Sequence, residues 1–345
     1  MKKVTIFGAL TLAVVLICFG VYMYAQNGAS DSANFKEPTP QSVKTDVTIT
    51  LHTDDETTKV QEKIGDFYRN LTIPTKDGKV FAGWYTASNA GERVNWLNIV
   101  PENDTELYAR WVTVKENAES ARGVPVLMYH WFYDDPKNAL DGNWYDINEF
   151  KKQLQYLSDN DFYFPSWDEL DAYIDGKLNL PPASVIITDD DAMESFINLA
   201  VPLIEKSKIP VTSFMISIYG HDYKNTKYIV SESHTHDMHR PGADGRGRMV
   251  NESVDVIRDD LLTSRKTIQN WTKKRQGLDT GKVEVLAYPF GHYNDTAKQA
   301  LSAEKFKLAF TTEYGRVTIG ADKLQLPRIR MSDGEGFESF KAKVD

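Results

Sequence analysis

The chain has 345 residues and a formal net charge of −9, with 26% charged and 12% aromatic residues. This length allows a catalytic domain of more than about 200 residues together with a smaller module. The acidic balance and the absence of a long basic run argue against nucleic acid and polyanionic substrates as default partners. The only cysteine, Cys18, lies in the apolar N-terminal run, so the remaining chain has no disulfide and no thiol nucleophile.

The first 25 residues have the pattern of a membrane anchor. Two lysines after Met1 precede an uncharged apolar run from Val4 to Ala25. A helix of this length spans about 33 Å, enough to cross the hydrocarbon core of a bilayer. Because the lysines stay inside, we expect a single-pass anchor over residues 1–25 and an extracellular catalytic domain. A cleaved signal peptide is the alternative, although the sequence around Ala25 is a poor cleavage site.

Residues 26–44 are rich in Ser, Asn, Gln, Pro and Lys and predict a linker. Strand patterns follow at Val47–Leu51, Phe81–Thr86 and Asp104–Trp111. Segment 45–113 resembles one copy of the internalin B-repeat (Listeria–Bacteroides repeat) module, which implies a small β-grasp-like domain. Two interpretations are open. The module contacts the wall or a ligand, or it is a spacer whose minimal core is formed by Trp84, Tyr108 and Trp111.

From about residue 120 the pattern alternates between strand and helix. Strands are predicted at Val124–His130, Val185–Ile187, Val211–Ile216, Val283–Tyr288, Leu308–Thr311 and Leu326–Arg330. Helices are predicted around Phe150–Leu157, after the capping box at Ser166–Glu169, over 193–208 with Pro202 as a possible kink, and over 251–274. This alternation predicts an α/β barrel with polar residues at the carboxyl ends of its strands.

Three consecutive carboxylates end one predicted strand, in the run Val185-Ile-Ile-Thr-Asp-Asp-Asp191. Like charges repel, and burying them costs more still, so a bound cation is the simplest compensation. About 40 residues later the run Ser233-His-Thr-His-Asp-Met-His239 offers imidazole ligands. One Asp and two His leave coordination positions open for water and substrate. The sequence therefore predicts a metal-dependent hydrolase.

Several ordered motifs in residues 120–345 resemble the polysaccharide deacetylases of the NodB-homology type (carbohydrate esterase 4). Within that family the chain is most similar to the branch that acts on N-acetylglucosamine polymers of biofilm and wall. The motifs are Tyr129-His130, Phe150 to Leu157, Thr188 to Asp191, the histidine run and Ala287 to Gly291. The resemblance implies a distorted (β/α) barrel, usually with seven strands.

By position, the resemblance makes Asp190 the general base and Asp191 a metal ligand. The family motif Thr-Phe-Asp-Asp-Gly stands here with Asp189 in place of the aromatic residue and Ala192 in place of the glycine. Both functional carboxylates are intact. One would hold the cation and the other would take a proton from the water that the cation polarises.

The other two ligands implied by the resemblance are His234 and His239. Their five-residue step would place them roughly 140° apart on a straight helix, so they need a turn or a loop. His234 and His236 could alternatively face one way on a strand, but we expect His236 to pack beside the ligands instead. Zinc is the default ion for such a site, and other transition ions also fit.

The Tyr288-Pro-Phe-Gly291 stretch resembles the family's Arg-x-Pro-Tyr motif. It implies that the backbone N–H of Phe290 helps to hold the oxyanion. The family's arginine, which orients the base, would fall at Ala287 and is absent. Arg328 or Arg330 on the late strand is the expected substitute.

The family's usual proton donor, a histidine in a C-terminal Leu-x-x-His motif, has no counterpart, because no histidine follows His292. The leaving amine still needs a donor, and a histidine has a suitable intrinsic pKa. His130, at the end of the first barrel strand, is the first candidate and His292 the second.

These observations predict a metal-dependent hydrolase that removes N-acetyl groups from N-acetylglucosamine residues of a cell-wall or extracellular polysaccharide. Peptidoglycan, poly-N-acetylglucosamine and the linkage units of wall polysaccharides are all open as substrates. The partners are then a glycan and, through the N-terminal helix, the membrane. One alternative is a catalytically degenerate adhesion protein that binds glycans, motivated by the altered first motif. Another is an esterase that removes O-acetyl groups from glycans.

Overall fold

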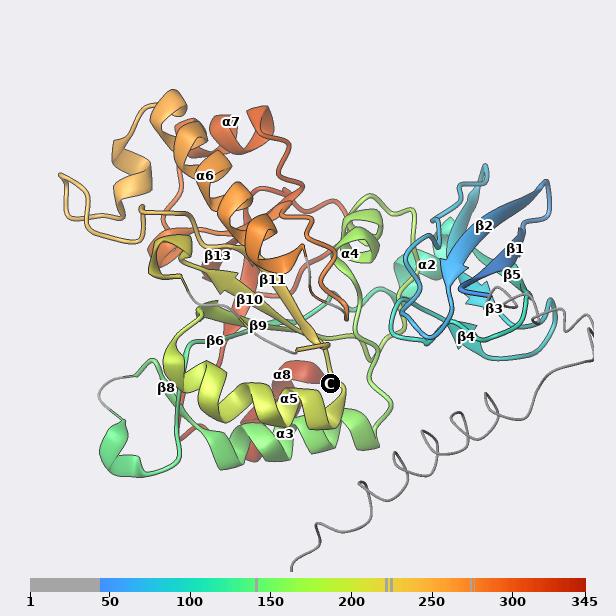
Figure 1. Cartoon of the computed structure of the whole chain (residues 1–345), viewed down its shortest axis with the longest axis horizontal. Helices are drawn as coiled ribbons and strands as arrows, with labels where there is room; N and C mark the ends of the chain where they lie inside the picture. The colour runs from blue at the N-terminus through green and yellow to red at the C-terminus, as the bar shows by residue number, and fades with distance from the viewer. Residues whose placement is uncertain (1–43, 140–141, 221–222, 224–225, 274, 276) are drawn as a thin grey trace, which may run out of the picture. The chain divides into compact units, whose positions relative to one another are not determined.

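The computed structural model describes residues 44–345 apart from 140–141, 221–222, 224–225, 274 and 276 (Figure 1). The predicted anchor over 1–25 lies outside the described residues, as does the predicted linker except for its last residue. Within the described part of the chain, no helix is long and apolar enough to cross a membrane. The compact unit from Thr45 to Asp345 contains two layered parts, a small sheet and a barrel.

The small part is a five-stranded mixed sheet in the order β2-β1-β5-β3-β4. Its elements are β1 (Asp46–His52), β2 (Thr57–Lys63), β3 (Lys79–Tyr85), β4 (Arg93–Val94), β5 (Thr105–Thr113) and the following helix α2 (Val114–Ser120). The central strands β1 and β5 run parallel, and the other neighbours are antiparallel. Alternate residues of β1, from Val47 to Leu51, are buried, as the period-two pattern predicts. Of the three aromatic residues expected in its core, Trp84 is deeply buried, whereas Tyr108 and Trp111 are only half-buried.

The large part is a closed, all-parallel barrel of seven strands, which confirms the expected architecture. Around the barrel the order is β10 (Val211–Met215), β11 (Ile229–Ser233), β12 (Val285–Ala287), β13 (Leu308–Tyr314), β14 (Leu326–Arg330), β6 (Val126–Tyr129) and β9 (Ile186–Asp191). A short parallel pair outside the barrel, β7 (Trp131–Tyr133) and β8 (Trp144–Asp146), was not predicted.

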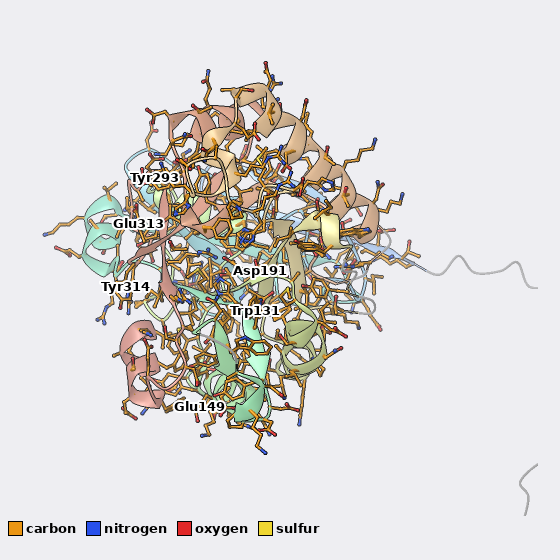
Figure 2. All side chains as sticks on the ribbon, turned by 90° about the vertical axis from the view of Figure 1, so that its left-hand side faces the viewer. Trp131, Glu149, Asp191, Tyr293, Glu313 and Tyr314 are labelled. Carbon is orange, nitrogen blue, oxygen red and sulfur yellow. The ribbon has the colours of Figure 1, made fainter. Side chains whose placement is uncertain are left out.

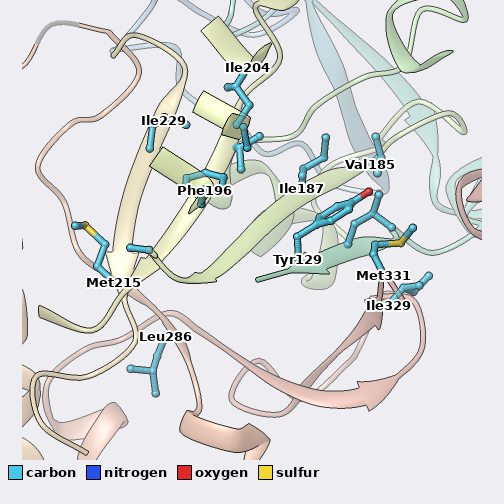
Figure 3. Packing of buried hydrophobic residues seen from close by; sticks show 14 of the residues in the cluster. Tyr129, Val185, Ile187, Phe196, Ile204, Met215, Ile229, Leu286, Ile329 and Met331 are labelled. Carbon is cyan, nitrogen blue, oxygen red and sulfur yellow. The ribbon is translucent and has the colours of Figure 1, made fainter. Parts of the chain in front are cut away.

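Helices cover the outer face of the barrel. They are α3 (Ile147–Asp159), α4 (Trp167–Ile174), α5 (Val201–Ser207), α6 (Val254–Thr272), α7 (Asp295–Ala303) and α8 (Phe337–Val344). Outward-facing strand residues such as Ile187, Ile229 and Leu286 pack in one buried cluster with helix residues such as Ile204 (Figure 3). The predicted capping box at Ser166 is present and begins α4.

The barrel interior belongs to a second buried cluster. It contains hydrophobic residues from every second position of the strands, the ones whose side chains face into the barrel, among them Val126, Ile186, Phe214 and Phe310. The same cluster includes core residues of the small sheet, such as Trp84. The interior of the barrel and the core of the small sheet therefore form one continuous apolar region.

Main-chain and side-chain bonds fasten the small sheet to the barrel. Phe81 exchanges backbone bonds with the segment after α4, where its N–H donates to Lys177 O over 3.1 Å and its carbonyl accepts from Asn179 N over 2.7 Å. The indole N–H of Trp96 donates to Phe164 O over 2.9 Å. Arg69 donates to Leu278 O over 2.8 Å.

Two predicted helices differ from the structure. The segment predicted over 193–208 is helical over 194–207, with a π-helical turn at Phe196–Ala200 before α5. Pro202, which has no N–H to donate, lies just after this turn, so the helix departs from regular α geometry where the sequence predicted a kink. The helix predicted from Asn251 begins at Val254, because Ser253 accepts a bond from Val256 N and caps it.

Candidate active site

The predicted site residues converge where the barrel strands end. Asp190 and Asp191 end β9, His234 follows β11, and Phe290 follows β12. The carboxyl ends of parallel strands meet at one mouth of a barrel, which is where this type of fold places its chemistry. Figure 2 shows Asp191 at this end of the barrel.

Asp190 is clamped by Arg328 inside the barrel. The two guanidinium nitrogens of Arg328 each donate to a different carboxylate oxygen of Asp190 over 2.7 Å. Both side chains are almost fully buried, at 0% and 3% exposed. Burial alone would raise the pKa of Asp190, but the charge and hydrogen bonds of Arg328 lower that pKa well below its usual value. Asp190 is therefore ionised and held in a fixed orientation, as a general base must be.

Arg330, the other expected candidate for this pairing, lies apart from Asp190. It is exposed and donates to Gly142 O over 3.2 Å and to the side chain of Asn143. The structure thus brings Arg328, and not Arg330, to the carboxylate at the end of β9.

Asp189 is buried beside Asp190 without a cationic partner of the kind that Arg328 provides for Asp190 within the described residues. Its side chain is fully buried, and Ser213 donates to its Oδ2 over 3.3 Å, while Oδ1 has no hydrogen-bond partner in the described part of the chain. Burial, followed by the neighbouring Asp190 and Asp191, raises the pKa of Asp189 well above its usual value. Burial therefore favours the neutral form of the carboxyl that stands where the family usually places an aromatic residue.

The chain turns sharply after the carboxylates. Asp191 has a φ of 76° and Ala192 a φ of 56°, both in the left-handed region that costs a non-glycine residue about 1–2 kcal/mol. The glycine that the family usually has at the position of Ala192 is explained by this geometry. Here Ala192 adopts the same turn at a cost in strain.

Asp191, His234 and His239 are brought together as predicted. One ligand atom from each lies within 4.8 Å of the others. The Nε2 atoms of His234 and His239 each lie 3.5 Å from Asp191 Oδ1. The two imidazole rings are 4.7 Å apart between centroids.

The donor atoms of this cluster fit a cation. His234 Nδ1 lies 2.8 Å from Ala287 O, so this nitrogen carries the proton and Nε2 presents a lone pair. Burial lowers the pKa of His234 to about 3, which keeps the ring neutral. Asp191 Oδ1 is buried and has no hydrogen-bond partner among the residues that the structure describes, and burial together with Asp190 raises the pKa of Asp191 to about 7. The Nε2 lone pair of His234 faces the carboxylate oxygen of Asp191, and a divalent cation between such donor atoms would satisfy both.

A tight turn accounts for the five-residue step between the two histidines. The carboxylate of Asp260 on α6 accepts from the backbone N–H of His236 over 2.7 Å and from that of Asp237 over 2.8 Å. His236 itself faces away from the ligand atoms and pairs with Ser217 Oγ over 2.9 Å. Asp260 therefore fixes the turn, and no pattern in the sequence of α6 distinguished it from its acidic neighbours.

Phe290 lies next to the cluster in the turn after β12. Its ring stacks on His239 at 4.3 Å between centroids and is 42% exposed. Its φ of 59° and the following Gly291 make this turn possible. A Cβ on Gly291 would lie 2.2 Å from Thr312 Oγ1 and 2.8 Å from Thr312 N, so only glycine fits there. The turn presents the backbone of Phe290 beside the ligands.

The two candidate proton donors differ in their surroundings. His130 follows β6 directly, and burial lowers its pKa to about 4, partly opposed by the charge of Asp190. His292 Nδ1 accepts a bond from Gly247 N over 2.9 Å, which a protonated Nδ1 could not do. His130 thus lies within the field of the Asp190–Arg328 pair, while His292 is tied to a neighbouring loop.

Sequence reasoning missed Trp131. This residue begins β7, and Figure 2 shows it beside Asp191. Burial and Asp190 raise the pKa of Asp191, and the Trp131 side chain opposes them by lowering that pKa. The indole N–H of Trp131 makes no regular hydrogen bond within the described residues. The ring packs edge-to-face on Trp144 at 5.4 Å. Only the position directly after Tyr129-His130 could have drawn attention to it.

Two segments match known families. Residues 47–110 match the Listeria–Bacteroides repeat domain, and residues 177–309 match the polysaccharide deacetylase family. A poly-β-1,6-N-acetyl-D-glucosamine N-deacetylase of Staphylococcus aureus (strain MRSA252) is 30% identical over 216 residues, which is 57% of this chain and 71% of the relative. An enzyme of the same description from Staphylococcus epidermidis is 29% identical over 214 residues, with 57% and 71% covered.

Solved structures show the same fold. The Streptococcus pyogenes deacetylase PplD in complex with acetate superposes with a TM-score of 0.53 at 23% identity, over 65% of this chain and 99% of that protein. The identity and coverage of the Staphylococcus relatives assign the family, and the carboxylates and histidines at the strand ends agree with that assignment. The chain belongs to the polysaccharide deacetylase family and is a polysaccharide N-deacetylase.

Proposed function

We propose that the enzyme removes N-acetyl groups from N-acetylglucosamine residues of a cell-wall or extracellular polysaccharide, and that it needs a divalent cation to do so. The observation that carries this proposal is the cluster of Asp191, His234 and His239 beside the buried pair of Asp190 and Arg328. The Staphylococcus relatives are named for poly-β-1,6-N-acetyl-D-glucosamine, which makes that polymer the first substrate to test. Peptidoglycan and wall-polysaccharide linkage units are the next.

Asp191, His234 and His239 would hold the cation, and zinc is the first ion to test for this donor set. When bound there, a divalent cation supplies Lewis-acid chemistry, since it lowers the pKa of water and polarises a carbonyl. The chain's own groups would do the rest. Asp190, kept ionised by Arg328, accepts the proton of the attacking water.

Two further groups would complete the reaction. The backbone N–H of Phe290 would donate to the oxygen of the acetamide carbonyl as its negative charge develops. His130 would deliver the proton to the departing amine, with His292 as the alternative. Acetate and a free glucosamine amine would be the products.

The decisive experiment measures acetate release from purified poly-β-1,6-N-acetylglucosamine and from peptidoglycan, with zinc, with a chelator, and with Asp190→Asn as the matched control. We expect release from at least one polymer, loss with the chelator, and loss with Asp190→Asn while the variant still binds metal. If neither these polymers nor wall linkage units yield acetate in the presence of metal, the proposal is wrong.

The sequence also allowed a glycan-binding adhesion protein with a degenerate site, but Asp191, His234 and His239 lie together beside Asp190 despite the departures at Asp189 and Ala192. Metal content separates the two: a degenerate site should bind no stoichiometric metal. An esterase acting on O-acetyl groups could use the same groups, and O-acetylated glycans belong in the same assay. For location, we propose an extracellular catalytic domain held by a membrane anchor over residues 1–25. Release of the protein from the membrane fraction by high salt would contradict the anchor.

A further inference from the structure

A cavity of about 180 Å³ lies at the barrel end opposite the catalytic carboxylates. It is lined by the first residues of β9, Ile186 and Ile187, and by Val230 and Glu232 of β11. The small sheet closes it from the other side with Trp84 and other residues. From Ile186 to Asp190 the strand covers about 13 Å, so the cavity is separate from the catalytic site.

Aromatic rings separate the two spaces inside the barrel. Trp167, which lines the cavity, lies 5.3 Å from Phe310 and 6.2 Å from Phe214 between ring centroids. On the far side of Phe214, the guanidinium carbon of Arg328 lies 5.7 Å from the ring. A molecule in the cavity would therefore contact Trp167 but could not reach Asp190.

The lining has the chemistry of a site for a neutral ring. Three tryptophans line it. The indole N–H of Trp84 donates to Thr72 O over 2.8 Å, and that of Trp96 donates to Phe164 O over 2.9 Å. These bonds fix the ring planes. Trp84 is buried in the core, whereas the rings of Trp96 and Trp167 are only half-buried and can make apolar contact with a ligand. Four Arg and Lys side chains and four Asp and Glu side chains also line the cavity. Within this lining Lys307 pairs with Asp168 over 2.9 Å and with Glu284 over 2.8 Å, so much of the charge is already compensated and a neutral ligand fits best.

Two buried polar groups lie in this lining. Glu232 is 3% exposed and accepts from the backbone N–H groups of Glu284 and Val285 with Oε2 alone, each over 3.0 Å. Arg93 has a buried Nε with no hydrogen-bond partner in the described part of the chain. Buried polar groups of this kind are what a ligand with hydroxyl edges would satisfy.

We propose that this cavity is a second, non-catalytic binding site for a single neutral pyranose ring. An engineered cavity of about 150 Å³ accommodates one benzene ring, so the size suits one six-membered ring and excludes a long chain. The apolar face of the sugar would pack on Trp96 and Trp167, and its hydroxyl groups would meet Glu232 and Arg93. A site formed by the sheet and the barrel together would hold a glycan at a point distant from the deacetylated residue.

Isothermal titration of the full chain with N-acetylglucosamine and with glucose, up to about 20 mM, tests the proposal, since a weak single-ring site has a Kd of about 1 mM. We expect binding in the wild type and in His239→Ala, which alters only the catalytic cluster. Trp96→Ala should weaken binding at least about tenfold, while Trp96→Phe, which keeps the aromatic face, should stay within about threefold. Trp96→Ala should release acetate from a soluble oligosaccharide at the wild-type rate.

Val230→Phe provides an independent test, because it fills the cavity and leaves the contacts of Trp96 intact. It should abolish sugar binding and leave acetate release unchanged. No heat from either sugar in the wild type would overturn the proposal. The proposal would also be overturned if sugar binding were lost in His239→Ala but kept in Trp96→Ala and Val230→Phe, because the sugar would then occupy the catalytic site. Binding of indole without binding of either sugar would refute the assigned ligand class. None of these outcomes depends on which polymer is deacetylated.

Discussion

Replacing Arg328 with methionine should destabilise the fold and remove the base at the same time. Arg328 is fully buried, and two 2.7 Å bonds join it to the two oxygens of Asp190, which is itself 3% exposed. Removing one partner of a buried pair leaves an uncompensated charge, at a cost of about 3–5 kcal/mol. Without Arg328, burial raises the pKa of Asp190, so its carboxylate takes up a proton and part of this cost is avoided. A protonated Asp190 cannot accept the proton of water.

The cost should depend on pH with a definite sign. In the wild type the folded pKa of Asp190 is depressed below 3.8, so the contribution of the pair is present above that value and lost only at still lower pH. In Arg328→Met the folded pKa lies above the unfolded one, so stability is lost as pH rises from about 4. The difference in unfolding free energy between the two proteins should therefore grow above pH 4, by at most about 1.4 kcal/mol per pH unit, until the variant's Asp190 ionises.

Urea denaturation at pH 4 and pH 7 in the presence of a chelator measures these differences. Arg330→Met is the matched control, because Arg330 lies two residues further along β14, is exposed, and its side chain donates to Gly142 and Asn143 at the surface and not to Asp190. It should change stability by less than about 1 kcal/mol. The double variant Asp190→Asn/Arg328→Met should recover part of the loss. A pH-independent loss, or a double variant no more stable than Arg328→Met, would refute the reasoning. Acetate release by Arg328→Met should fall at least about 100-fold.

Three further predictions concern the metal cluster and the proton donors. In metal-free protein, Asp191→Asn should be more stable than the wild type at pH 8 but not at pH 4. Burial and Asp190 raise the pKa of Asp191 to about 7, so the stability of the wild type falls as pH rises through that value. Equal pH profiles of the two proteins in urea denaturation would contradict this. Asp260→Asn should weaken zinc affinity about 10–100-fold by loosening the turn that carries the histidines, while the exposed control Asp259→Asn should leave it unchanged in a competition titration. His130→Asn should lower kcat at least about 100-fold and His292→Asn less than about 10-fold, and the reverse order would exchange their roles.

The sequence predicted the ends of the barrel strands better than their surroundings. The buried β-branched run before Asp189 and the histidine run after β11 had local patterns, and both fall at the carboxyl ends of barrel strands that β10 separates. The choice between Arg328 and Arg330 could not be made from the pattern, because residues two apart on a strand face the same side. Depth in the barrel decides it. Arg328 lies inside, while Arg330 lies beyond the rim.

Other features had no signal in the sequence. Asp260 is one of several acidic residues on a polar helix, and only the tertiary position of α6 brings it to the turn between the two histidines. The short pair β7 and β8, which presents Trp131, has too few residues to show a period. The bonds between the small sheet and the barrel are mostly to main-chain carbonyls, which any residue supplies.

The three consecutive carboxylates illustrate how a costly sequence becomes a working site. Each is relieved differently: Asp190 by the guanidinium of Arg328, Asp189 by burial that favours its neutral form, and Asp191 by the cation we propose. The three solutions depend on one another. An ionised Asp189 would raise the pKa of Asp190 and oppose the effect of Arg328. The departure from the family motif at Asp189 is therefore compatible with a general base at Asp190, because burial raises the pKa of Asp189 while Ser213 bridges it to Tyr223.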